Sequence, residues 1–560
     1  MKPAFLKAAL VLMWTCAALA EGYPERGRSM LITTGGIVAS EHPLASQAAA
    51  QILASGGNAI DAAITANACM GVLSPMQCGM GGDLFAIVYE AKTGEIHGLN
   101  ASGWSAAALT AEYLRKQGQT AMPTTGPHVV TVPGCVSGWE HLQKKFARKR
   151  LSELLAPAIA LAEEGAPVPE IIGGYWRSEE KKLRKEPSTA AVFLPNERAP
   201  AVGEVFRNPD MAWSLRQVAS HGAKAFYNGP IAQRIVDYLH AKGSVLTVED
   251  FSEFSAEWVD PIFTTYRGWT VYELPPNGQG IAALSMLNIL ENFPMREWGH
   301  NSSNALHTMI EAKKLAYADM LRYVGDQRFS KVPAPEMLSK KHARNRAKLI
   351  DPGKANCNVE ASRNFDPGPD TTYLCVVDKD GNMVSLIQSI YHSFGSGLVA
   401  PGTGFALQNR GALFTLEPGH PNLLDGHKRP VHTIIPAFME KGDTRIAFGI
   451  MGGWNQSQAH AQFVANVVDY GMNIQTALEA PRFTKGTFEG CDVKLEGRVS
   501  QAVIDDLKQR GHQLTVTQPL HSDMGCGQAV LRNFSTKVNF GASDPRKDGA
   551  AIPEPIRIAK

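Results

Sequence analysis

The stretch Asp370-Thr371-Thr372-Tyr373-Leu374-Cys375-Val376-Val377-Asp378-Lys379-Asp380-Gly381-Asn382 decides how this chain is interpreted. Residues 371–377 are rich in β-branched and aromatic types, which predicts a strand. The dipeptide Asp380-Gly381 and an alternating run over 383–390 predict a tight turn and a second, paired strand. The preceding segment, 361–369, contains two prolines and a glycine, which predicts an exposed connector. Thr371 is therefore expected at the start of a strand, directly after a segment that can be cut.

Cleavage between Asp370 and Thr371 would give Thr371 a free α-amine beside its own hydroxyl. An α-amine has a pKa of about 8, so it can take a proton from the hydroxyl near neutral pH. One residue then supplies both nucleophile and base, which is the logic of an N-terminal-nucleophile hydrolase. A threonine pair at the start of a strand is also what β-propensity alone produces, so the assignment depends on the rest of the chain.

Periodicity along the chain predicts a mixture of long helices and hairpin-paired strands. Helices are expected over 42–55, 59–70, 152–164, 210–242, 280–292 and 304–323, and strands over 84–89 and 263–274. This mixture favours helices layered on both sides of two stacked sheets. The glycine cluster Gly79-Met80-Gly81-Gly82 lacks the lysine of a P-loop and the spacing of a dinucleotide fingerprint, which argues against nucleotide binding.

Several further motifs flank the hairpin in a fixed order. They are Val38-Ala39-Ser40-Glu41-His42-Pro43-Leu44-Ala45, Gly56-Gly57-Asn58-Ala59-Ile60-Asp61-Ala62-Ala63, Gly79-Met80-Gly81-Gly82-Asp83, Pro276-Asn277-Gly278-Gln279-Gly280, Phe394-Gly395-Ser396-Gly397, Lys428-Arg429-Pro430 and Gly452-Gly453. With Thr371-Thr372 they resemble the γ-glutamyltranspeptidase family over nearly all of the chain. The resemblance implies the α+β fold of N-terminal-nucleophile hydrolases, an αββα four-layer sandwich of two stacked sheets flanked by helices.

The resemblance also implies a self-cleaving enzyme with Thr371 as nucleophile and its α-amine as base. Cleavage between Asp370 and Thr371 would give a large subunit, 21–370, and a small catalytic subunit, 371–560. The two would stay associated as a heterodimer that shares one αββα fold. Gly452 and Gly453 align with the pair whose N–H groups form the oxyanion hole, and Ser389 aligns with a second hydroxyl near the nucleophile.

The substrate pocket departs from the pattern of γ-glutamyl enzymes. Those enzymes use an arginine and an aspartate to hold the glutamate carboxylate and amine, and the resemblance places Ser102 and Leu413 there instead. Further positions expected to bind substrate are Tyr391, Arg410, His432 and Thr433. An unpaired desolvated charge costs several kcal/mol, so Leu413 leaves an ammonium without its partner. Arg410 can still hold a carboxylate, with His432 or Tyr391 as further hydrogen-bond donors.

The resemblance therefore implies hydrolysis or transfer of γ-glutamyl groups from glutathione-like amides, through an acyl-enzyme on Thr371. Leu413 favours an alternative, a glutaryl or cephalosporin-type acylase. A third possibility is a homologue that only binds a partner, against which the retained Thr371, Ser389 and glycine pair argue. No metal and no organic cofactor is expected, because the threonine, its amine and backbone donors complete the machinery.

The first 20 residues carry the marks of a secretory signal peptide. Lys2 and Lys7 precede an apolar run over 8–14. Ala18-Leu19-Ala20 fits a small-x-small cleavage pattern before Glu21. The run is too short to span a bilayer stably, although an uncleaved anchor is the alternative. The mature protein is expected in the periplasm or outside the cell.

The charge and the cysteine content restrict which partners, metal sites and disulfides the sequence can have. A net charge of +2 with both signs mixed gives no indication of a nucleic-acid partner. Seven cysteines follow the expected signal peptide, with no spacing typical of a zinc site. They allow either a disulfide, for which Cys69 and Cys78 are the closest pair in sequence, or buried free thiols.

Overall fold

The structure is a computed structural model that describes residues 27–359 and 370–556. The predicted signal peptide, 1–20, and the predicted connector, 361–369, lie outside these residues. Both therefore stay predictions.

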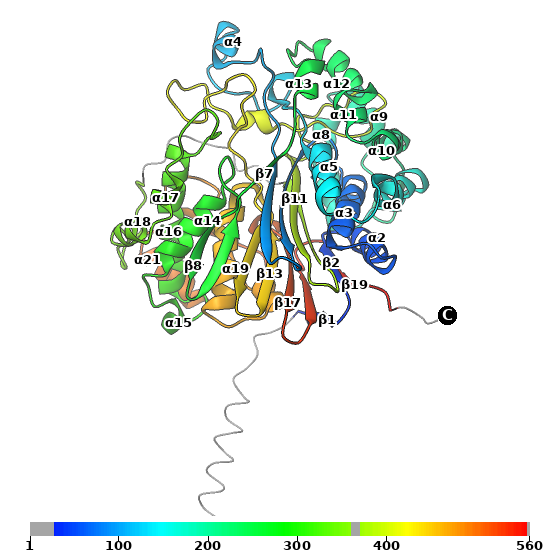
Figure 1. The fold of residues 1–560 in the computed structure, drawn as a ribbon. Helices are drawn as coiled ribbons and strands as arrows, with labels where there is room; N and C mark the ends of the chain where they lie inside the picture. The colour runs from blue at the N-terminus through cyan, green and yellow to red at the C-terminus, as the bar shows by residue number, and fades with distance from the viewer. Residues whose placement is uncertain (1–26, 360–369, 557–560) are drawn as a thin grey trace, which may run out of the picture.

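Two seven-stranded antiparallel sheets form the centre of the molecule (Figure 1). The first sheet has the strand order β19 (Ala550–Pro553), β2 (Ile37–Ser40), β10 (Asp370–Val377), β11 (Met383–Tyr391), β3 (Asp83–Glu90), β4 (Glu95–Ala101) and β7 (Glu257–Val259). The second has the order β1 (Leu31–Thr33), β18 (Val538–Ser543), β17 (Gly527–Asn533), β13 (Thr444–Ile450), β12 (Ala437–Lys441), β9 (Trp269–Glu273) and β8 (Ile262–Tyr266). Each sheet combines strands from before and after Asp370, so the two parts of the chain share one fold.

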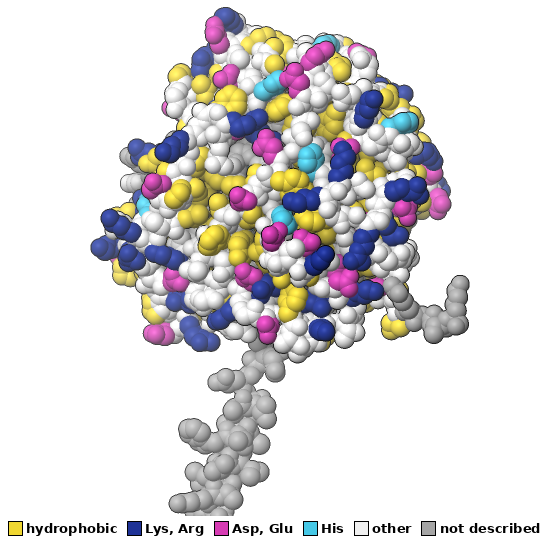
Figure 2. All heavy atoms as spheres, viewed as in Figure 1, with side chains coloured by type: hydrophobic (Ala, Val, Ile, Leu, Met, Phe, Trp, Pro, Cys, Tyr) yellow, Lys and Arg dark blue, Asp and Glu magenta, His cyan; other side chains and the backbone are white. Residues whose placement is uncertain are grey.

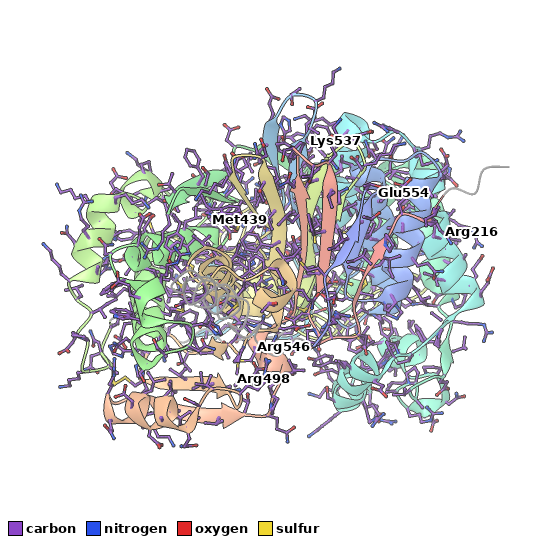
Figure 3. The ribbon with its side chains drawn as sticks, turned by 90° about the horizontal axis from the view of Figure 1, so that it is seen from below. Arg216, Met439, Arg498, Lys537, Arg546 and Glu554 are labelled. Atoms are coloured by element: carbon purple, nitrogen blue, oxygen red, sulfur yellow. A yellow bond between two sulfur atoms is a disulfide. The ribbon has the colours of Figure 1, made fainter. Side chains whose placement is uncertain are left out.

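Helices cover the outer face of each sheet, and the view from below shows the sheets side by side between them (Figure 3). The helices that share a hydrophobic core with the first sheet include α2 (Pro43–Ala54), α3 (Ala59–Leu73), α5 (Cys135–Phe146), α6 (Leu151–Glu164), α10 (Pro209–His221) and α12 (Pro230–His240). Those that share a hydrophobic core with the second include α14 (Gly280–Leu290), α16 (Ser303–Tyr323), α19 (Gln456–Val468), α20 (Ile474–Glu479) and α21 (Gln501–Gln509). This arrangement confirms the predicted αββα sandwich.

Shorter elements surround the sandwich. The helices are α4 (Ala111–Lys116), α7 (Glu170–Ser178), α8 (Glu180–Leu183), α9 (Pro187–Phe193), α11 (Lys224–Tyr227), α13 (Val248–Ser252), α15 (Met295–Trp298), α17 (Ala334–Met337) and α18 (Lys340–Ala347). Small sheets are formed by β14 (Phe483–Thr484), β15 (Asp492–Glu496) and β16 (Gln513–Thr517), and by β5 (Ala166–Pro167) and β6 (Val205–Phe206).

Strand β10 shows why the central strands are apolar throughout. Successive side chains of a strand point to opposite faces of its sheet. Tyr373 and Cys375 belong to the core between the two sheets, whereas Leu374 and Val376 belong to the core beneath the helices. Both faces are buried, so neither requires polar residues. The predicted hairpin is confirmed, since β10 pairs antiparallel with β11.

Most expected helices appear within a few residues of their predicted bounds. The segment expected to be helical over 210–242 is helical, but it is divided into three helices, α10, α11 and α12. Gly222 ends α10 with a φ of +66°, a conformation that glycine adopts without steric cost. Asn228-Gly229 separates the next two, and Pro230 then begins α12.

The structure contains a disulfide between Cys357 and Cys491, with a Cα–Cα distance of 4.9 Å. Cys69 and Cys78, the pair closest in sequence, are both buried free thiols. Burial raises the pKa of the Cys69 thiol to about 12, so that side chain is an unreactive part of the core.

The face of the molecule in Figure 2 carries basic and acidic side chains interspersed, without a field of one sign. This agrees with the small net charge. The face in this view has no basic patch of the kind that binds a polyanion. Among the described residues, no helix combines the length and the apolar character that crossing a bilayer requires.

Candidate active site

Thr371 lies where the pairing of β10 with β11 becomes irregular. Asp370 pairs with Tyr391 and Thr372 pairs with Gln388, so β11 has one extra residue opposite Thr371. Such bulges bend a strand and re-aim its side chains, and they are common beside active sites. Tyr391, at the end of β11, has a φ of +78°, which is unusual for a bulky residue.

Two side chains reach the Thr371 hydroxyl. Thr371 Oγ1 lies 3.4 Å from Ser389 Oγ and 3.5 Å from Gln456 Nε2. Gln456 is the first residue of α19. Thr371 and Ser389 are completely buried. The structure thus brings the predicted nucleophile and the predicted second hydroxyl together, and adds an amide donor from the second helix layer.

Arg410 lies next to this pair. Its Nη2 donates to Ser389 Oγ at 2.9 Å and its Nη1 to Thr433 Oγ1 at 2.6 Å. The guanidinium carbon lies 4.6 Å from the centre of the Tyr391 ring. Ser389, Tyr391, Arg410 and Thr433, all predicted site residues, therefore form one cluster with Thr371.

The Arg410 guanidinium is fully buried, yet no described carboxylate lies within ion-pair distance of it. Its Nε has no hydrogen-bond partner among the described residues. Burial lowers the pKa of Arg410 to about 10, an effect partly opposed by the charge of Asp83. The side chain remains a cation at neutral pH, and it is held in the interior by neutral hydroxyls and an aromatic ring.

His432 is also in this region, but its ring N–H is already used. His432 Nε2 lies 2.9 Å from Asp83 Oδ2, and the Ile434 N–H reaches Nδ1 at 3.3 Å. Burial lowers the pKa of His432 to about 4, so the ring is neutral, with its proton on Nε2. The donor role toward substrate predicted for His432 is not supported by this arrangement, in which His432 orients the loop beside Thr433.

Ser102 and Leu413 have surroundings that differ from those of the cluster around Thr371. Ser102 accepts a hydrogen bond from Asn277 Nδ2 at 3.1 Å, and no contact joins it to Arg410 within the described part of the chain. Leu413 is 1% exposed and belongs to the same hydrophobic core as Tyr391. Leu413 is therefore an apolar core residue, and its correspondence with the carboxylate of γ-glutamyl enzymes stays a prediction.

The glycine pair Gly452-Gly453 leads into α19. Gly452 has a φ of +123° and Gly453 a φ of +57°, and Gln279 Nε2 holds the Gly453 carbonyl at 2.8 Å. Within 27–359 and 370–556, neither glycine N–H donates to a protein acceptor. Gly453 is buried and Gly452 is partly exposed beside a cavity. Buried N–H groups without partners are rare, and that of Gly453 lies in the loop that also presents Gln456 to Thr371. Both N–H groups are therefore available to a substrate, and their role as an oxyanion hole stays a prediction.

Asp83, Gln279, Asn455 and Gln456 are the functional candidates that sequence analysis did not single out. Asp83 and Gln279 lie in motifs used for the resemblance, but nothing in those motifs indicates their partners. Asp83 Oδ1 accepts from the N–H groups of Gly103 and Gly134 at 2.9 and 3.1 Å. Asp83 therefore fixes His432 to two loops of the large part of the chain.

One buried cluster among the described residues has the composition of a metal site. His307, Glu311 and His512 place potential ligand atoms within 4.8 Å of one another. However, Lys314 Nζ pairs with Glu311 at 2.6 Å, and the two histidine rings share a hydrogen bond of 2.8 Å. These groups satisfy one another, so we assign no ion to them.

Two stacked antiparallel sheets between helix layers, with a buried threonine at the start of a central strand, define the class of N-terminal-nucleophile hydrolases. Comparison with known proteins identifies the family. The family description "Gamma-glutamyltranspeptidase" matches residues 45–554. The chain belongs to the γ-glutamyltranspeptidase family of enzymes.

Three similar proteins carry different names. A "Glutathione hydrolase-like" proenzyme of Bacillus subtilis is 37% identical, over 93% of this chain and 99% of its own. An oxamate amidohydrolase proenzyme of Klebsiella pneumoniae is 34% identical, over 93% of this chain and 98% of its own. The crystal structure of a cephalosporin acylase from Bacillus halodurans is 40% identical with a TM-score of 0.88, covering 95% of this chain and 98% of that one. The names of these relatives refer to different substrates.

Proposed function

We propose that this protein is a self-cleaving N-terminal-threonine amidohydrolase whose acyl donor carries a carboxylate but no α-amine. The observation that carries this proposal is Arg410, a buried cation that pairs with no carboxylate among the described residues. Its Nη2 lies 2.9 Å from the hydroxyl that contacts Thr371. A guanidinium binds a carboxylate through parallel, charge-assisted hydrogen bonds. A dicarboxylic monoamide, such as a glutaryl amide, supplies that carboxylate within the acyl group.

In the proposed reaction the Thr371 hydroxyl attacks the amide carbonyl while its α-amine takes the proton. The negative charge that develops on the carbonyl oxygen is received by the N–H groups of Gly452 and Gly453. The C–N bond then breaks, the amine leaves with the proton, and the acyl group stays on Thr371 as an ester. Water hydrolyses the ester and restores the threonine.

Leu413 is the reason for excluding an α-amine. A substrate ammonium in this interior would face the buried Leu413 and the Arg410 cation, and a like charge adds to the cost of desolvation. Relatives named for oxamate and for cephalosporins support a donor other than γ-glutamyl, whereas relatives named as glutathione hydrolases support the γ-glutamyl alternative.

The deciding experiment compares glutaryl- and γ-glutamyl-p-nitroanilide on matured protein, by release of p-nitroaniline. These substrates differ only in the α-amine. We expect a higher kcat/KM for the glutaryl compound. A higher value for the γ-glutamyl compound would overturn the proposal and establish γ-glutamyl hydrolysis or transfer.

The role of Arg410 predicts the behaviour of Arg410→Gln. Losing charge-assisted hydrogen bonds of about 1.5–3 kcal/mol should lower kcat/KM for the glutaryl substrate by roughly 10- to 100-fold. The melting temperature should not fall, because the substitution removes a buried charge that has no counterion in the described part of the chain.

Arg150→Gln is the control for that variant, since the Arg150 side chain is 83% exposed. Its activity and melting temperature should match those of the unmodified protein. A large loss of stability in Arg410→Gln with full activity would show that Arg410 is structural.

The disulfide makes a separate prediction, because Cys357 precedes the proposed cleavage site and Cys491 follows it. After cleavage the two subunits should remain covalently linked. A denaturing gel without reductant should show one species, and reductant should release two chains. Cys357→Ser should give two chains in both conditions. Two chains from the unmodified protein without reductant would contradict the linkage.

Disulfides persist mainly in oxidising compartments, so this bridge also supports our proposal that the protein is exported.

A further inference from the structure

A cavity of about 570 Å³ opens beside the oxyanion glycines. Gly452 and Asn455 line it from the loop that leads into α19, and Ser393 lines it from the loop that follows β11. Each of these loops also reaches the reaction centre. Gln456 follows Asn455 and contacts Thr371, and Tyr391 precedes Ser393 and donates its N–H to Ser389 Oγ at 2.8 Å. Two of the loops that line the cavity therefore also contact the Thr371–Ser389 pair.

Asn455 is the unusual member of this lining. Its side chain is 5% exposed, and neither its amide oxygen nor its amide nitrogen has a hydrogen-bond partner among the described residues. Burying an amide without partners is unfavourable, so such groups need an explanation. The amide is fixed between two glycines: a Cβ added at Gly452 would lie 3.4 Å from Asn455 Nδ2, and one added at Gly525 would lie 2.8 Å from it.

The remaining lining is polar. Among the described residues around the cavity, none has an aliphatic side chain, and Tyr175 is the one aromatic residue. Lys494 and Asp523 both line the cavity and form an ion pair of 2.6 Å, with the lysine side chain about half exposed. An apolar group placed here would remove water from these charges without replacing their hydrogen bonds.

We propose that this cavity receives the leaving amine of the substrate, and that Asn455 selects a polar, hydrogen-bonding amine over an alkyl or aryl amine. This deepens the proposed function and rests on the reaction proposed at Thr371. The acyl group lies toward Arg410, and the amine extends past Gly452 into the cavity. The Asn455 amide then finds both a donor and an acceptor in a group of the amine such as a peptide bond.

The test uses one fixed acyl group, whichever the p-nitroanilide comparison selects, joined either to glycylglycine or to p-nitroaniline. In Asn455→Ala, the ratio of kcat/KM for the glycylglycine amide to that for the p-nitroanilide should fall by about tenfold or more. The melting temperature should stay unchanged, because no internal hydrogen bond of Asn455 is lost. An unchanged ratio would overturn the proposal.

Asn228→Ala is a matched control, since Asn228 is exposed in the turn between α11 and α12. The ratio should stay unchanged in this variant. If Asn455→Ala fails to mature, a comparison of two substrates on the unmodified protein tests the proposal instead. The kcat/KM for the glycylglycine amide should be about tenfold higher than that for an isopentylamide of the same acyl group. Equal or better cleavage of the isopentylamide would overturn the proposal. Because the acyl group is held constant, a γ-glutamyl preference would defeat only the proposed donor and leave this test intact.

Discussion

Thr371→Ala is expected to remain a single uncut chain and to release no measurable p-nitroaniline. The substitution removes the one hydroxyl that serves both reactions, the attack on the Asp370 carbonyl and the attack on substrate. Loss of a catalytic nucleophile typically lowers kcat by about 10⁴- to 10⁶-fold. Intact-mass analysis and a reducing gel report the cleavage, and the glutaryl p-nitroanilide assay reports turnover.

Thr371→Ser is the matched control for this variant, because it keeps the hydroxyl and removes only the methyl group. We expect it to cleave and to turn over more slowly than the unmodified protein. The alanine variant should fold normally, since the only side-chain hydrogen bonds that Thr371 forms with described residues are the two long ones at 3.4 and 3.5 Å. Normal cleavage in Thr371→Ala would remove Thr371 from the mechanism.

The position of Thr371 could be predicted because the signals that fix it are local. The alternating pattern and the Asp380-Gly381 turn determine the β10–β11 hairpin within about 20 residues of sequence. The layered architecture followed from the spacing of helices and strands together with the family motifs. The exception was the 210–242 segment, where helical periodicity continued through Gly222 although that glycine ends α10.

The partners of the site residues could not be predicted, because they depend on how the layers stack. His432 and Asp83 are 349 positions apart, and Gln456 and Thr371 are 85 apart. Arg410 was predicted as a carboxylate-binding residue, but that no described carboxylate pairs with it is a property of the assembled interior. Likewise, the cysteines that bridge are 134 positions apart, whereas the pair closest in sequence lies on buried elements that keep their thiols free.

Gly452→Ala is expected to lower kcat by about 10²- to 10³-fold, which is the usual cost of removing one oxyanion donor. Gly452 has a φ of +123°, outside the left-handed region that other residues tolerate. An added Cβ would also lie 3.3 Å from the Asn455 Cβ and 3.4 Å from the Gly525 Cα. The loop must shift to relieve both constraints, and its N–H groups turn away from the position of the oxyanion.

The loss should fall on kcat more than on KM, because the oxyanion exists only in the transition state. Gly243→Ala separates this effect from general backbone strain, since Gly243 has a φ of +87° and open space around its Cβ position. It should lose a comparable amount of stability and keep its kcat. Maturation of Gly452→Ala should be slowed as well, if the same glycines serve the self-cleavage reaction. A kcat close to that of the unmodified protein would mean that the N–H groups of this loop do not face the reacting carbonyl, and the oxyanion would then have to be stabilised by side chains such as Gln456.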